Sequence, residues 1–294
     1  MQTVHSQVPM IPLRDGTSIP QIGFGTLRVQ PSRDASQPNI DTTADVVGLA
    51  LQAGYRHIDT AQAYGTERGV GKAIANSGIP REQMYVTSKL ANSNHRPDDL
   101  RRSFDETMAG LGLDQLDLFL VHWPLPTLYD GDYVSTWNAV AALTAEGRLR
   151  TAGISNFQPA HLDRIIAETG ITPAVNQVEL HPYFTNRAVR AAAARHGIAV
   201  EAHSPLGHNG QPLTDETITA IAAARRKTAA QVILRWHIQQ GTIVIPKSAR
   251  PERMAENLAV LDFELTAEEI ASIDALDRGE TGRAGPNPDT YEGV

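Results

Sequence analysis

Residues 84–122, MYVTSKLANSNHRPDDLRRSFDETMAGLGLDQLDLFLVH, contain the pattern that decides the fold. Two short strand-like runs, MYVTSK (84–89) and DLFLVH (117–122), flank a longer amphipathic segment that begins at Pro97. Proline suits the first turn of a helix, because the N–H that it lacks would have no partner there. The stretch therefore predicts a strand, a helix and a second strand, which is the repeating unit of parallel sheets.

The same alternation extends in both directions along the chain. Strand-like runs cover residues 21–25, 57–60, 84–89, 117–122, 150–155, 174–179, 198–203 and 242–247. Helix-like stretches begin near Thr42, Glu67, Pro97, Tyr133, Pro159, Asn186, Thr214 and Pro251, and Gly54, Gly147, Gly170 and Gly197 suit positions just beyond a last helical turn. An open doubly wound sheet would use the same alternation. The number of strands, the length and the lack of a domain-splitting linker favour an α/β fold closed as a (β/α)₈ TIM barrel.

Two further elements flank this barrel in the sequence. The segment MIPLRDGTSIPQIG (10–23) predicts a hairpin that turns at Asp15-Gly16. A helix over 266–277 opens with the capping-box pattern Thr266-Ala-Glu-Glu269. We therefore expect residues 1–294 to form a single barrel domain with an N-terminal β-hairpin and an extra C-terminal helix.

The composition excludes several classes of protein. Of 294 residues 41% are hydrophobic, and 26 Lys and Arg against 33 Asp and Glu give a net charge of −7 with no basic stripe, which argues against a nucleic-acid partner. The chain has no cysteine, so disulfides and thiolate metal sites are excluded. The first sixteen residues lack a basic and apolar leader pattern, and no run approaches the ~18 apolar residues of a membrane span. We expect a cytoplasmic protein that does not associate with a membrane.

Polar residues stand at the end of nearly every predicted strand, where a parallel barrel carries its chemistry. They are Asp59, Lys89, His122, Ser155 with Asn156, Gln177 with Glu179, His203 with Ser204, and Lys247 with Ser248. Tyr64 follows Asp59 by five residues, in a loop from which it could reach Lys89. An ammonium lowers the pKa of a neighbouring phenol, and such a Tyr can protonate a carbonyl oxygen to which a neutral His also donates. Each residue alone has an ordinary structural explanation; their combination indicates a site.

Three stretches that contain these residues resemble the signatures of the aldo-keto reductases. GYRHIDTA (54–61), followed after five residues by ERGVG (67–71), resembles the first signature, and GISNF (153–157) resembles the middle one. IPKS (245–248), with Arg253, Glu256 and Asn257 behind it, resembles the C-terminal cofactor signature. The resemblance runs from about Ile11 to Asp277, and it is strongest to bacterial 2,5-diketo-D-gluconate reductase-like members.

This resemblance implies a reaction and a set of catalytic residues. Asp59, Tyr64, Lys89 and His122 would form the catalytic tetrad, with Tyr64 as general acid. The implied protein is a monomeric, NADPH-dependent reductase of small aldehydes or ketones, including dicarbonyls or keto sugars, with no metal and no obligate protein partner. Two alternatives stay open: a non-catalytic NADPH-binding sensor or structural barrel, and a metal-dependent barrel hydrolase, which the absence of paired His ligands disfavours.

The resemblance also implies how NADPH/NADP⁺ is bound, since no G-x-G-x-x-G fingerprint follows a strand. Ser155, Asn156 and Gln177 would contact the nicotinamide carboxamide, and Ser204, Leu206 and Gly207 would line the pyrophosphate path. The adenosine 2′-phosphate would be held by Lys247, Ser248 and Arg253, since a guanidinium binds phosphate oxygens bidentately. The adenine would contact Glu256 and Asn257, and the remaining expected contacts are Gly25, Thr26 and His203.

Several positions depart from the family pattern. His203 stands where a large aromatic residue usually stacks on the nicotinamide. Either it merely fills this space, or its protonation lowers NADP⁺ affinity below about pH 6.5. Leu27 and Ala91 stand where bulkier aromatic residues are common and should widen the substrate pocket, of which Trp123 forms an aromatic wall. The polar loop 29–42 either covers the pocket or is disordered. The Gly- and Pro-containing tail 279–294 is expected to form one edge of the substrate mouth.

Overall fold

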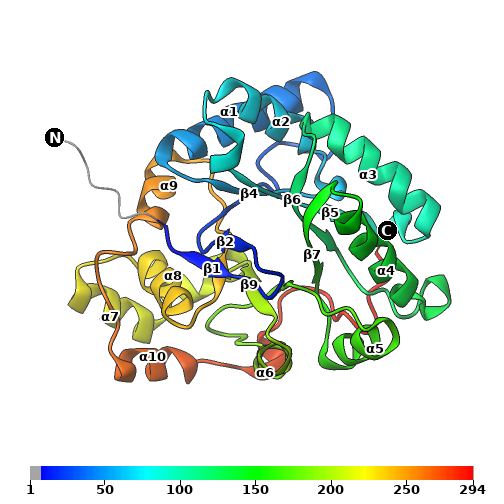
Figure 1. Cartoon of the computed structure of the whole chain (residues 1–294). Coiled ribbons are helices and arrows are strands. Elements are labelled where there is room, and N and C mark those ends of the chain that lie inside the picture. Colours follow the sequence, from blue (N-terminus) through cyan, green and yellow to red (C-terminus); the bar gives the residue numbers. More distant parts are fainter. Residues whose placement is uncertain (1–7, 294) are drawn as a thin grey trace.

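The computed structural model describes residues 8–293, and its centre is an eight-stranded parallel sheet (Figure 1). The strands neighbour one another in sequence order: β3 (Phe24–Gly25), β4 (His57–Asp59), β5 (Tyr85–Leu90), β6 (Leu116–Val121), β7 (Leu149–Ser155), β8 (Val175–Glu179), β9 (Ala199–His203) and β10 (Ile243–Val244). A parallel bridge between Ile22 and Val244 joins the two ends of the sheet, and the Gly23 N–H donates to the Val244 carbonyl at 2.8 Å. The predicted closed barrel is thereby confirmed.

Helices surround the sheet, as Figure 1 shows in a view onto the hairpin end. They are α1 (Gln37–Ala53), α2 (Glu67–Asn76), α3 (Pro97–Leu111), α4 (Tyr133–Ala145), α5 (Pro159–Thr169), α6 (Arg187–His196), α7 (Glu216–Arg225), α8 (Ala229–Gln239), α9 (Pro251–Leu258) and α10 (Ala267–Asp274). Several predicted helix ends are confirmed. The helices α1 and α5 end at Gly54 and Gly170, both in the left-handed conformation. The helix α10 begins with the predicted capping box of Thr266 and Glu269.

Two helix predictions were wrong. The first helix begins at Gln37 rather than near Thr42, because Pro38 fits its first turn and the Asp34 carboxylate organises the turn before it by accepting from the Ser36 N–H at 3.0 Å. The helix predicted from Thr214 is two helices, α7 and α8. Arg226 takes the left-handed conformation and ends α7, and a capping box of Thr228 and Gln231 starts α8. The first and last barrel strands are also shorter than predicted.

The amino-terminal end of the barrel is closed by the predicted hairpin. Strands β1 (Met10–Pro12) and β2 (Ser18–Pro20) pair antiparallel. Leu13 and Ile19 of this hairpin pack on an apolar layer inside the barrel that contains Leu118, Leu120, Val175 and Ile243. This apolar layer lies at the hairpin end of the barrel, opposite the end at which the strands finish.

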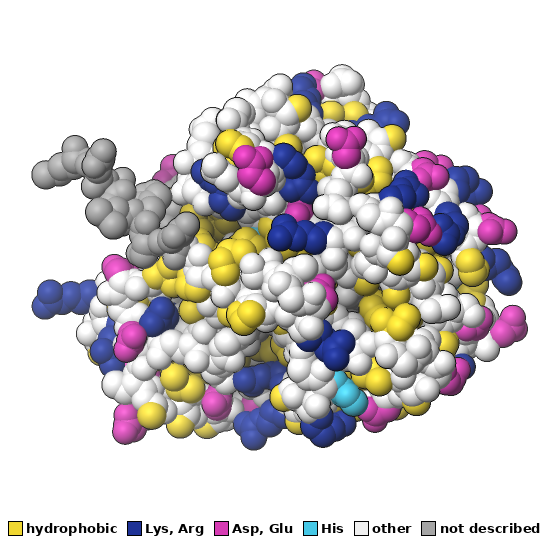
Figure 2. All heavy atoms as spheres, viewed as in Figure 1, with side chains coloured by type: hydrophobic (Ala, Val, Ile, Leu, Met, Phe, Trp, Pro, Cys, Tyr) yellow, Lys and Arg dark blue, Asp and Glu magenta, His cyan; other side chains and the backbone are white. Residues whose placement is uncertain are grey.

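The distribution of surface charge and the length of the helices relate to the expectations about nucleic-acid and membrane binding. Figure 2 shows acidic and basic side chains interspersed on the hairpin face. No helix within residues 8–293 is long and apolar enough to cross a membrane. The expectation about a leader concerns residues 1–16, of which 1–7 lie outside the described part of the chain.

Candidate active site

A cavity of about 830 Å³ lies at the carboxyl ends of the strands. Asp59 ends β4, and a 3₁₀ turn (Gln62–Tyr64) directly behind it brings Tyr64 to the cavity wall. His122 follows β6 and also lines the cavity, whereas Lys89, on β5, lies fully buried beneath it. Four polar residues from three neighbouring strands are thus brought together.

The buried ion pair of Lys89 and Asp59 forms the base of this group. The Lys89 Nζ donates to Asp59 Oδ1 at 2.6 Å and to the Thr60 carbonyl at 2.9 Å. It lies 5.0 Å from the centre of the Tyr64 ring, which in turn meets the His122 ring edge to face at 5.7 Å between centroids. The phenol and the imidazole therefore stand side by side above a fixed positive charge.

Burial and charge set the protonation of these groups. Burial acts to lower the pKa of Lys89, but the acidic neighbours, first the charge and hydrogen bond of Asp59 and then Tyr64 and Glu201, together outweigh burial and raise this pKa. Burial, with Lys89 nearby, holds the pKa of His122 well below its usual range, so the imidazole is neutral at pH 7. The expected lowering of the Tyr64 pKa is wrong: burial raises it, and Lys89 opposes without prevailing. Tyr64 therefore keeps its proton at neutral pH, as a general acid must.

Most of the residues expected to bind the cofactor line this same cavity. They are Gly25, Ser155, Asn156, Gln177, His203, Ser204, Leu206, Gly207 and Lys247. Thr26 instead is fully buried and donates its hydroxyl to the Asp59 carbonyl at 2.9 Å. The others lie beyond the cavity, around α9. Arg253 is exposed, Ser248 accepts from the Arg250 N–H at 3.0 Å, Glu256 accepts from Thr228, and Asn257 is buried.

The donor set of the cavity fits a nicotinamide dinucleotide. The side-chain amides of Asn156 and Gln177 are fixed by internal hydrogen bonds: Asn156 Nδ2 donates to the His122 carbonyl at 3.0 Å, and Gln177 Nε2 donates to Asp59 Oδ2 at 2.8 Å. Ser155, Asn156 and Gln177 all line the cavity, so an amide-bearing ring would meet preorganised polar partners. Toward α9 follow the exposed cations Lys247 and Arg253, as a phosphate requires.

His203 lines the cavity, but its expected titration needs a correction. Burial lowers the pKa of His203 to about 4. Its Nε2 and the Asn156 Oδ1 are 3.1 Å apart, which suits a neutral ring that donates to the amide. The predicted loss of NADP⁺ affinity below about pH 6.5 therefore moves to below about pH 5.

The expected substrate residues Leu27, Ala91 and Trp123 also line the cavity, together with the C-terminal tail. Tyr291 of the tail packs against Trp123 with 4.3 Å between ring centres. Of the predicted loop 29–42, residues 37–42 belong to α1, and residues 29–36 lie against the cavity. Arg33 contributes to the lining, and Gln30 Nε2 holds the loop to the Tyr64 carbonyl at 3.4 Å.

Two buried glutamates lie next to this site: Glu179 is one of the predicted polar strand ends, whereas Glu201 was not predicted. The Glu179 carboxylate accepts from the backbone N–H groups of Ala284 and Gly285 at 2.7 and 2.8 Å and so fastens the tail to the cavity. Glu201 lies deeper, inside the barrel, with its side chain fully buried. A signal for it was present, because it interrupts the apolar run that precedes His203 in IAVEAH (198–203).

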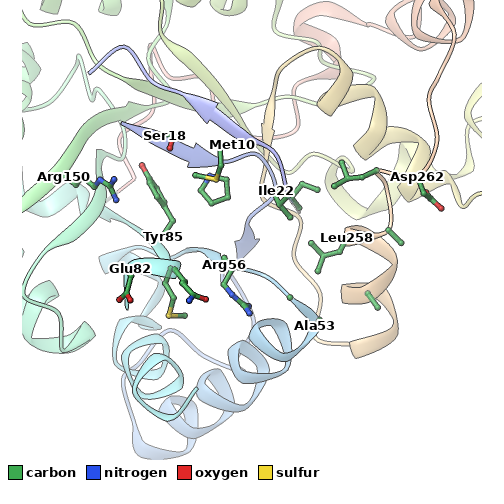
Figure 3. Close-up of a pocket in the computed structure, with 18 residues that line it drawn as sticks. Met10, Ser18, Ile22, Ala53, Arg56, Glu82, Tyr85, Arg150, Leu258 and Asp262 are labelled. Carbon is green, nitrogen blue, oxygen red and sulfur yellow. The ribbon is translucent and has the colours of Figure 1, made fainter. Parts of the chain in front are cut away.

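A second cavity, of about 1000 Å³, opens at the hairpin end of the barrel. Figure 3 shows its wall, formed by Met10 and Ser18 of the hairpin, Ala53 at the end of α1, Leu258 of α9 and Tyr85 of β5. None of the four tetrad residues lines it. Within residues 8–293, no group of three His, Asp or Glu side chains is placed to hold a metal ion.

Comparison with known proteins agrees with this geometry. The model of the Aldo/keto reductase family matches residues 21–278. An aldo-keto reductase of Mycolicibacterium smegmatis is 50% identical, over 96% of this chain and 98% of that protein, and the methylglyoxal reductase DkgA of Escherichia coli is 41% identical, over 97% and 98%. The crystal structure of a Gox0644 mutant in complex with NADPH matches with a TM-score of 0.88 and 42% identity, over 97% and 98%.

These matches extend over nearly the whole chain and include all three stretches that resemble family signatures. They agree with a closed barrel whose strand ends hold Asp59, Lys89 and His122 beside Tyr64. The chain therefore belongs to the aldo/keto reductase family and is an oxidoreductase that uses a nicotinamide cofactor.

Proposed function

We propose that this protein reduces small aldehydes and ketones to alcohols with NADPH, that Tyr64 supplies the proton, and that the chain acts as a single barrel domain. The observation that carries the proposal is the buried Lys89–Asp59 pair directly beneath a protonated Tyr64 and a neutral His122 at the wall of one cavity.

The roles of the residues follow from their charges. NADPH, when bound, supplies the hydride that the carbonyl carbon accepts. Tyr64 gives its phenolic proton to the carbonyl oxygen, so that its O–H bond breaks as the new O–H bond forms. The Lys89 ammonium stabilises the resulting phenolate, and Asp59 fixes the ammonium. The neutral His122 donates an N–H hydrogen bond to the same carbonyl oxygen and so orients the substrate.

The cofactor would be held by two groups of residues. Ser155, Asn156 and Gln177 would fix the carboxamide and hence the face of the nicotinamide that meets the substrate. Lys247 and Arg253 would bind the 2′-phosphate, which favours NADPH over NADH.

The proposed substrates are small dicarbonyls or keto sugars. Leu27 and Ala91 leave room where larger side chains would narrow the cavity, and Trp123 with Tyr291 forms an aromatic wall. The similarity to a methylglyoxal reductase supports the dicarbonyl class. A monomeric state and a cytoplasmic location also belong to the proposal, and sedimentation of the purified protein tests the first.

The test is NADPH consumption with a panel of methylglyoxal, diacetyl, nitrobenzaldehyde and 2,5-diketo-gluconate, measured for the parent and for Tyr64→Phe. General acid catalysis contributes about 100- to 10,000-fold, so the variant should lose activity by that factor while its NADPH affinity, measured by fluorescence titration, stays unchanged.

Other results would separate the remaining alternatives. A parent protein that binds NADPH tightly but turns over none of the panel would favour the non-catalytic sensor. Activity that survives Tyr64→Phe would refute the assignment of the acid.

A further inference from the structure

A second carboxyl group, that of Glu201, is buried in the barrel next to Gln177, the residue that donates to Asp59. Glu201 precedes the cavity-lining His203 by two residues on β9, so both side chains point inward. In the sheet, Glu201 is in register with Gln177 of β8 on one side and Ile243 of β10 on the other. Its side chain is fully buried, and the reaction described above does not use it.

The surroundings offer this carboxyl group no hydrogen bond within residues 8–293. Neither of its oxygens has a partner. The closest basic group is the fully buried His57, whose Nε2 is 3.7 Å from Glu201 Oε1 and is already engaged with Thr87 Oγ1 at 3.0 Å. The Lys89 and Gln177 side chains both donate to Asp59 instead.

A carboxylate without donors in a dry interior is costly, and the group becomes neutral by keeping its proton. Burial raises the pKa of Glu201 to about 8; the charge of Asp59 acts in the same direction, and Lys89 and the neighbouring Gln177 amide oppose it without prevailing. Burial lowers the pKa of His57 to about 3, so His57 is neutral and does not form an ion pair with Glu201. The other ionisable group nearby, Tyr85, has its pKa raised by burial and stays neutral too.

We propose that Glu201 is a positioning residue that sets the strength of Tyr64 as an acid, acting through Lys89. With Glu201 protonated, Lys89 faces a single carboxylate and its remaining positive field acts on the phenol. With Glu201 ionised, a second negative charge offsets that field, the Tyr64 phenolate loses stabilisation, and proton transfer to the substrate slows. The proposal rests on the proposed role of Tyr64.

The variant that tests it is Glu201→Gln, which is close in shape and uncharged at every pH. At about pH 6.5 both proteins carry a neutral side chain, so kcat should agree within about threefold. As the pH rises through about 8, wild-type kcat should fall while that of Glu201→Gln holds, and their ratio should reach about tenfold near pH 10, the effect of one added charge at an intermediate dielectric. KM for the carbonyl substrate should change little, because Glu201 does not touch the cavity.

Glu201→Asp is the matched variant, because it restores a titratable group and should restore the alkaline fall in kcat. In a Tyr64→Phe background, Glu201→Gln should leave the pH dependence of the residual rate unchanged. These variants distinguish the two proposals. Activity that survives Tyr64→Phe would refute the role of Tyr64, whereas loss of activity in Tyr64→Phe with identical wild-type and Glu201→Gln profiles would refute only the role of Glu201.

A second readout does not depend on activity. The infrared difference spectrum of the wild type minus Glu201→Gln should contain the band of a protonated carboxyl group at pH 7, and this band should disappear as the pH rises through about 8. A difference spectrum without a protonated carboxyl band at pH 7, or a Glu201→Gln protein that folds but loses more than about tenfold activity at pH 6.5, would overturn the proposal.

Discussion

The two ends of the barrel use the same strands for opposite purposes. On β5, Tyr85 belongs to the apolar layer beneath the hairpin, and Lys89, four residues later, belongs to the ion pair beneath the carboxyl-end cavity. Each end has a cavity, and that at the hairpin end is the larger, about 1000 against about 830 Å³. The comparison teaches that convergent polar side chains with shifted pKa values, rather than cavity size, identify the active end.

The largest effect is expected when the Lys89 charge, beneath the carboxyl-end cavity, is removed. Lys89→Met replaces the ammonium with an apolar side chain of similar length and leaves Asp59 buried without its partner, which should destabilise the protein by about 3–5 kcal/mol and abolish measurable reduction. Urea unfolding and NADPH consumption measure the two effects. The double variant Lys89→Met/Asp59→Asn should recover much of the stability and none of the activity. Turnover by Lys89→Met near the wild-type rate would contradict the proposed role.

The next largest effect is expected for a substitution of Arg253. It tests whether the cofactor site extends from the cavity to α9. Arg253→Ala should raise KM for NADPH about 10- to 100-fold, since a hydrogen bond to a charged group contributes about 1.5–3 kcal/mol. KM for NADH should not change, because NADH lacks the 2′-phosphate. The control is Arg14→Ala at the hairpin end, where Arg14 donates to the Thr172 carbonyl, and both constants should then stay at their wild-type values. Equal losses for both cofactors in Arg253→Ala would argue against phosphate recognition.

A smaller effect is expected when the pH is lowered, and it compares a histidine at the cavity with a histidine deeper in the barrel. The pKa values of His203 at the cavity and His57 in the lower barrel are lowered to about 4 and about 3, in each case chiefly by burial. The unfolded chain takes up protons below about pH 6.5 and the folded chain does not, so the free energy of unfolding should fall between about pH 6.5 and 4. NADP⁺ affinity should stay constant from about pH 8 to 5, because His203 is neutral there. Fluorescence titration measures the affinity, and a steady decline from pH 7 would show that His203 titrates normally.

The smallest effect is expected for the tyrosine of the opposite end. Tyr85→Phe removes a buried hydroxyl that has no hydrogen-bond partner within residues 8–293, so stability should change by less than about 1 kcal/mol. The variant should keep NADPH-dependent reduction within about twofold of the parent, in contrast to Tyr64→Phe. A large loss of activity in Tyr85→Phe would mean that the two ends of the barrel are coupled.

Much of this architecture could be predicted from local patterns. The eight strands, the hairpin at Asp15-Gly16 and the capping box at Thr266 follow from short-range preferences that the tertiary structure did not override. The boundary between α7 and α8 was missed, although Thr228 with Gln231 is a capping-box pattern, because it lies inside a continuous Ala-rich stretch. The start of α1 was missed because proline is common both in loops and in the first turn of a helix, so Pro38 did not distinguish the two.

The sequence by itself determined the order of the elements and the identity of the polar strand ends, because alternation and spacing are local properties of the chain. Only the tertiary structure decided the protonation of those residues. The acidity of Tyr64 and His203 and the neutral state of Glu201 depend on burial, and burial depends on neighbours that are distant in sequence. The fastening of the tail to Glu179 and the approach of Lys89 to Asp59 join segments 105 and 30 residues apart. Such contacts exist only once the barrel has closed. Only then are the interior groups buried beside the neighbours that shift their pKa values.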